Sequence, residues 1–102
     1  MSQTLSKSDR LKLSFKFLAI AQLENKEQLD KLIGQLEQEF SQYLDFIQQF
    51  VNLPPETVVF KLEREYPALQ SMLENPGFAG KAQDVVRKIQ AYLKEKGNKN
   101  VD

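Results

Sequence analysis

Residues 26–52 read KEQLDKLIGQLEQEFSQYLDFIQQFVN, and this stretch decides the fold. Its large apolar residues follow one another at alternating steps of four and three, which is the spacing of one face of a helix. They are Leu29, Ile33, Leu36, Phe40, Tyr43, Ile47 and Phe50. Asn25 is the expected N-cap, with Gln28 in the capping-box position three residues later. The pattern predicts one continuous central helix, roughly 40 Å long.

Prolines and glycines divide the sequence that follows this helix. Leu53-Pro54-Pro55 ends it, and the second of these prolines suits the first position of a new helix. Pro67 is expected to break that third helix near Tyr66, because the residue before a proline avoids helical geometry. Asn75-Pro76-Gly77 predicts a turn. A final amphipathic helix then ends near Gly97, which is expected to supply a left-handed cap.

The N-terminal segment admits two interpretations. Residues 11–17 read LKLSFKF, and this alternation of apolar and polar residues is typical of a half-buried strand. The continuation 18–23 lacks the alternation and favours a helix. On a helix, 11–17 has a broad apolar face suited to the middle of a bundle. We favour the helix and keep the strand as the alternative.

A chain of 102 residues fits one domain, so residues 1–102 are expected to share a single core. The predicted fold is all-α: a small four-helix bundle with one long central helix at about 26–52 and a proline-broken third helix. The polar ends, residues 1–8 and 98–102, are expected to be flexible tails.

The composition argues against catalysis. With no cysteine and no histidine, the chain lacks thiol nucleophiles, histidine-based catalytic sets and the usual metal ligands. The nearest carboxylate pairs lie on different sides of their helices and cannot meet at one substrate atom. We therefore predict no enzyme, no catalytic or metal-binding residues and no cofactor. No small-molecule substrate is evident either.

The cytoplasm is the default location, since no cysteine pairs suggest an oxidising compartment. The longest uninterrupted apolar run in the basic N-terminal segment, residues 17–21, is too short for a membrane span or a secretory signal. We expect no association with a membrane.

An excess of large apolar residues lies around the end of the long helix. Phe46, Phe50, Leu53 and Phe60 are candidates for a surface that a partner covers, because contiguous exposed apolar patches mark contacts. The favoured function is a non-enzymatic protein–protein interaction module: an adaptor, a regulator or a small subunit of a complex. Self-association as a homodimer is one form of this prediction.

The alternative function is nucleic-acid binding through the basic ends of the chain. Fourteen basic and fourteen acidic residues cancel overall, but residues 81–102 carry six bases against three acids. The candidate basic patch is Lys81, Arg87, Lys88 and Lys94. These bases are spread around the polar side of the last helix, and no recognition motif accompanies them. We therefore rank this function below protein binding.

Overall fold

The computed structural model describes residues 6–78 and 80–99, and these residues form helices and connecting turns without any strand. The elements are α1 (Lys7–Gln22), α2 (Lys26–Glu39), α3 (Ser41–Gln48), α4 (Pro55–Glu65), α5 (Pro67–Leu73), the 3-10 turn η1 (Pro76–Phe78) and α6 (Lys81–Lys99). The all-α prediction is confirmed. The four-helix bundle is wrong, because the described residues form six α-helices.

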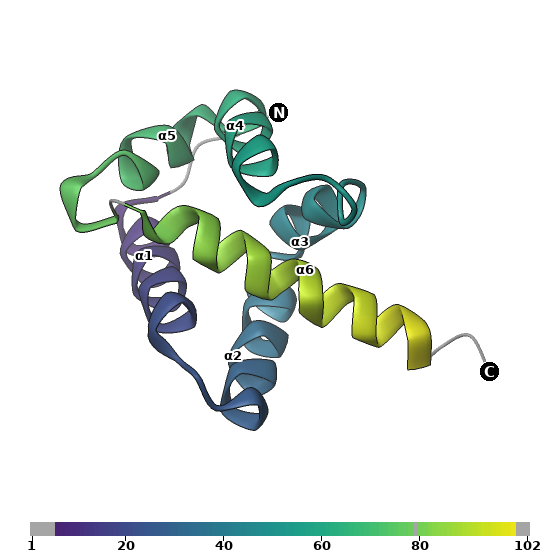
Figure 1. The fold of residues 1–102 in the computed structure, drawn as a ribbon. Helices are drawn as coiled ribbons and strands as arrows, with labels where there is room; N and C mark the ends of the chain where they lie inside the picture. Colours follow the sequence, from purple (N-terminus) through teal and green to yellow (C-terminus); the bar gives the residue numbers. More distant parts are fainter. Residues whose placement is uncertain (1–5, 79, 100–102) are drawn as a thin grey trace.

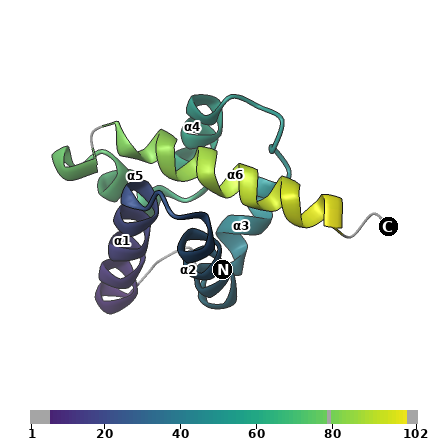
Figure 2. The same ribbon diagram turned by 60° about the horizontal axis from the view of Figure 1, so that its bottom comes forward.

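The element at the centre of the molecule is α6. Figure 1 shows it running across the other helices, and α1, α2, α3 and α4 all contact it. The view turned by 60° shows the same arrangement (Figure 2). Its inner face contributes Val85, Ile89 and Leu93, each at most 3% exposed, to a core shared with the other helices. The last helix therefore has the central position that the sequence assigned to residues 26–52.

The predicted continuous helix over 26–52 is wrong, because the chain breaks at Phe40. This residue has φ −137° and ψ 52°, which separates α2 from α3. The apolar seam is nevertheless buried on both sides of the break, with Leu36, Tyr43 and Ile47 all at most 2% exposed. No proline or glycine lies at the break. Tertiary packing accounts for it: the change of direction lets Tyr43 meet Tyr66 edge-on, with ring centroids 4.8 Å apart.

The N-terminal segment is helical, as we favoured. The alternation in 11–17 arises from two stripes with helical spacing on opposite sides of α1. Leu13 and Phe17 face the core and are at most 1% exposed, whereas Leu11 and Phe15 face outward and are 55% and 67% exposed. A helix with apolar residues on both sides produces a period of two in the sequence without being a strand.

Several predicted helix ends are confirmed. The Asn25 side chain accepts a hydrogen bond from the backbone N–H of Gln28 at 3.0 Å, as an N-cap does. Pro55 opens α4, and the chain leaves helical geometry at Tyr66 before Pro67 opens α5.

The predicted cap at Gly97 is wrong. The last helix α6 continues to Lys99, and the positive φ among the described glycines belongs to Gly80, at +76°. Gly80 lies in the turn before α6, where a left-handed residue redirects the chain. Gly97 lies within α6 and has no positive φ.

The expected flexible tails, 1–8 and 98–102, lie largely outside the described residues, although α1 already begins at Lys7 and α6 reaches Lys99. In the described part of the chain, no helix is both long enough and apolar enough to cross a bilayer.

Candidate functional site

A groove lined by aromatic rings lies between the end of α3 and the outer side of α4. Phe46 and Phe50 form one side, and their ring centroids lie 5.2 Å apart in an edge-on arrangement. Phe60 on α4 forms the other side and is 58% exposed. The hollow has a volume of about 770 Å³. We call it the aromatic groove; its lining residues are Phe46, Phe50, Thr57, Phe60, Lys61, Arg64 and Glu65.

A stack of aromatic rings fixes the inner side of the aromatic groove. The ring of Phe46 meets Tyr66 edge-on at 5.7 Å, and Tyr66 in turn packs against the buried ring of Tyr43. Edge-on pairs of this kind each contribute about 0.5–1.5 kcal/mol beyond burial. Phe46 is therefore held from behind while its outer edge faces the groove.

A buried amide from the last helix fixes the loop that joins α3 to α4. Gln90 is 6% exposed, and its Nε2 donates hydrogen bonds to the backbone carbonyls of Phe50 at 3.1 Å and Leu53 at 2.9 Å. The Phe50 carbonyl also accepts a hydrogen bond from the backbone N–H of Leu53 at 3.1 Å, so the Gln90 side chain adds to the bonds that hold this turn. The two sides of the aromatic groove are held at a set spacing as a result.

Two cations lie over the rings of the aromatic groove. The ammonium of Lys61 is 5.1 Å from the centroid of Phe50, and the guanidinium carbon of Arg64 is 5.5 Å from that of Phe60. Within the described residues, neither cation forms an ion pair. Glu65 is the one carboxylate among the lining residues.

Carboxylates lie near Tyr66, the ring that packs behind Phe46. Burial raises the pKa of the Tyr66 hydroxyl above its ordinary value, and the carboxylates of Glu65 and Asp45 raise it further. Carboxylates therefore influence the inner side of the groove, near Tyr66, whereas Lys61 and Arg64 lie over its rings.

The predicted partner surface is largely brought together in space. Phe46, Phe50 and Phe60 line the same groove, while Leu53 lies in the adjoining loop, 36% exposed, and is not among the lining residues. Sequence reasoning missed Lys61 and Arg64, although Arg64 lies four residues after Phe60 on α4 and therefore on the same helix face. It also missed the exposed stripe of α1 described above.

The predicted basic patch does not gather on one surface. The Lys88 ammonium is committed to α1, where it donates to the carbonyls of Ile20 (3.1 Å), Ala21 (2.9 Å) and Leu23 (2.8 Å). The last carbonyls of a helix lack partners within it, and a cation is favourable at that end. Lys88 therefore caps α1 from a distant helix.

The other three bases of that patch do not lie together on one face of α6. Lys81 donates to the carbonyl of Gly77 at 3.3 Å, and Arg87 pairs with Asp84 at 3.0 Å. Lys94 is exposed on the side of α6 that Arg87 shares, seven residues further on. The four bases thus divide between two faces of α6.

In the part of the chain that the structure describes, no group of three or more metal-ligating side chains lies together. No protein-family model, curated protein or solved structure matches the chain.

Proposed function

We propose that this chain is a non-enzymatic helical protein–protein interaction module that binds its partner in the aromatic groove. The observation that carries the proposal is Phe60, a large aromatic residue that is 58% exposed beside a groove of about 770 Å³ lined by two further phenylalanines. Aromatic residues set in a hollow are the usual energetic centres of protein interfaces. An adaptor or regulator in the cytoplasm is the form of this function that we propose.

The charges of the groove define the kind of partner. Lys61 and Arg64 lie over the rings and have no ion pair within the described residues. A partner segment that carries an aromatic or large aliphatic anchor next to acidic residues would satisfy both the rings and the cations. We therefore propose an acidic segment with an apolar anchor as the occupant.

A second copy of the chain fits the groove less well than a separate partner. A two-fold contact of groove against groove would bring Lys61 and Arg64 of one copy toward the same cations of the other. The other exposed apolar stripe, Leu11 and Phe15, belongs to a segment where residues 1–23 carry four bases against one acid. Both contacts would place like charges together.

Nucleic-acid binding receives less support than protein binding. Lys88 is used in capping α1, Arg87 is paired with Asp84 and Lys81 donates to the carbonyl of Gly77, so three of the four bases of the candidate patch have intramolecular partners. The bases that remain are too few and too far apart to follow a phosphate backbone.

The test is a selection of peptides from a displayed random library on the full chain, followed by affinity measurements with the enriched peptides. We expect enriched sequences that combine an apolar anchor with aspartate or glutamate. Phe60→Ser should weaken their binding by about 30-fold, the effect of losing about 2 kcal/mol at an interface centre. Phe15→Ser is the matched control: Phe15 is also a strongly exposed phenylalanine, but it lies on α1.

Two results would contradict the proposal. One is enrichment of peptides that bind the Phe60→Ser protein as tightly as the wild type. The other is loss of binding with Phe15→Ser while Phe60→Ser has no effect, since this would move the binding surface to α1.

A further inference from the structure

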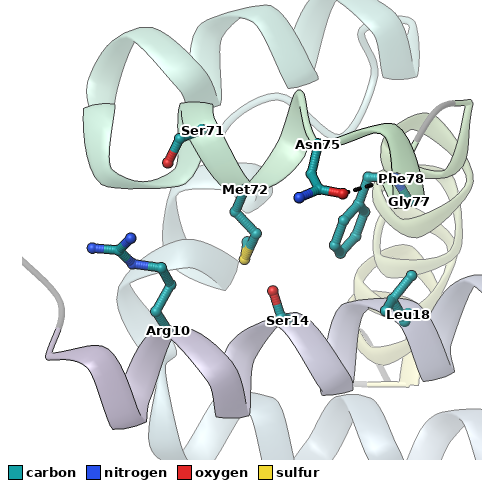
Figure 3. Close-up of a pocket in the computed structure, with 8 residues that line it drawn as sticks. All are labelled: Arg10, Ser14, Leu18, Ser71, Met72, Asn75, Gly77 and Phe78. Carbon is teal, nitrogen blue, oxygen red and sulfur yellow. Dashed lines mark hydrogen bonds between the residues drawn. The ribbon is translucent and has the colours of Figure 1, made fainter.

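A second cleft lies on another part of the molecule, between α1 and the segment that runs from α5 through η1. Its volume is about 410 Å³, within the range of about 300–1,000 Å³ that is usual for small-molecule sites. Figure 3 shows its two walls, with Arg10, Ser14 and Leu18 on α1 facing side chains of the opposite segment. The opposite wall carries Ser71, Met72, Asn75, Gly77 and Phe78.

The floor of the cleft is apolar. Met72 and Phe78 reach into it and are 6% and 4% exposed, and Leu18 is half-buried beside them. A thioether and a ring at this depth offer contact to a short hydrocarbon body.

The rim of the cleft consists of hydrogen-bond donors. Arg10 supplies the guanidinium, and Ser14 and Ser71 supply hydroxyls. Within the described residues, the Arg10 side chain forms no ion pair, and no carboxylate lines the cleft. The rim is therefore suited to an anion.

The orientation of Asn75 strengthens this match. Its Oδ1 accepts a hydrogen bond from the backbone N–H of Gly77 at 2.8 Å, which fixes the amide and turns its NH₂ group toward the cleft (Figure 3). An amide that presents its nitrogen is a donor, whereas the opposite orientation would have presented an acceptor. Asn75 thus supplies a second donor on the wall opposite Arg10.

We propose that this cleft binds a small carboxylic acid with a short apolar body. The single cation of the rim matches the single charge of a carboxylate, which a guanidinium binds through two parallel hydrogen bonds. The carbon chain would lie against Met72 and Phe78. This site is separate from the aromatic groove, and neither proposal depends on the other.

The experiment is a titration of the isotope-labelled full chain with sodium hexanoate, followed by amide NMR. We expect saturable shifts concentrated at residues 10–18 and 71–78. Hexanol, which has the same carbon chain without the charge, should bind at least about tenfold more weakly, because it lacks the charge-assisted bonds. Arg10→Gln should weaken hexanoate binding by a similar factor. Lys12→Gln is the matched control, since it removes an exposed cation from the same helix that does not line the cleft.

The following results would overturn the proposal. Equal binding of hexanol and hexanoate would show that the rim does not recognise charge. Tighter binding of hexyl phosphate than of hexanoate would assign the rim to a phosphate. Shifts elsewhere in the molecule, no saturable shift at all, or unchanged binding by the Arg10→Gln protein would remove the site. Arg10 is exposed, so the variant is expected to fold, and circular dichroism checks this.

Discussion

Replacing Lys88 by methionine tests the contact between α6 and the C-terminal end of α1. Methionine keeps the length and most of the volume of the side chain but removes the ammonium. Three hydrogen bonds, to the carbonyls of Ile20, Ala21 and Leu23, are lost together. The last turn of α1 contains no basic residue that could replace them.

The size of the effect follows from these contacts. A hydrogen bond to a charged group contributes about 1.5–3 kcal/mol, but three bonds share one ammonium here and the carbonyls at a helix end regain part of the loss from water. A partly buried cation at a helix C-terminus contributes up to about 2 kcal/mol. We expect Lys88→Met to lower the free energy of unfolding by about 2–4 kcal/mol.

Urea unfolding followed by circular dichroism measures this loss. At about 4–8 °C per kcal/mol for a domain of this size, Tm should fall by at least about 8 °C. Lys94→Met is the control, because Lys94 is an exposed lysine of the same helix, and its effect should stay within about 0.5 kcal/mol. A Lys88→Met protein as stable as the control would refute the view that Lys88 caps α1.

Three other changes test separate parts of the structure. In urea unfolding, Gly34→Ala should stabilise the protein by about 0.5–1 kcal/mol, because a Cβ there would meet Tyr92 Oη at an ordinary 3.8 Å. Gly80→Ala should destabilise it by about 1–2 kcal/mol, because the φ of Gly80 is +76°. A Gly34→Ala protein less stable than the Gly80→Ala protein would contradict both predictions. Burial, and then the charge of Glu74, raises the pKa of Glu63 above 4.5, so the folded state binds its proton more tightly and stability falls as pH rises through that pKa. The Glu63→Gln protein should therefore be as stable as the wild type below pH 4.5 and more stable than the wild type at neutral pH, as thermal unfolding at a series of pH values would report. Equal stability of the two proteins at neutral pH would refute this. Gln90→Leu should cost about 1–3 kcal/mol and speed amide exchange in the loop 49–54, and unchanged exchange there would contradict its role.

Local signals in the sequence predicted helix ends better than helix paths. Asn25, Pro55 and Pro67 act through their own backbone or side chain, so their effects are readable from the sequence. The break at Phe40 has no such signal, because it depends on the meeting of Tyr43 with Tyr66, a residue from a distant part of the chain. The regular apolar spacing continues through the break and conceals it.

In the candidate sites too, features that depend on local spacing could be predicted from the sequence, and contacts between distant residues could not. Phe46, Phe50 and Phe60 could be selected from the sequence because large aromatic residues crowd the end of one helical segment. Of their cations, Arg64 could be placed beside Phe60 by its spacing on α4, but the placement of Lys61 over Phe50 joins α4 to the turn after α3 and has no signal in the sequence. The cleft between α1 and the α5–η1 segment combines Arg10 with residues more than sixty positions away, and no spacing in the sequence predicts it.

The contact between Lys88 and the end of α1 also has a consequence for biosynthesis. The ammonium that completes the first helix lies 65 to 68 residues further along the chain than the carbonyls it binds. A ribosome must synthesise the chain as far as Lys88, at about 5–20 residues per second, before α1 acquires this partner. Helix α1 therefore emerges well before the residue that completes it, and a nascent chain stalled before α6 should remain sensitive to protease at α1.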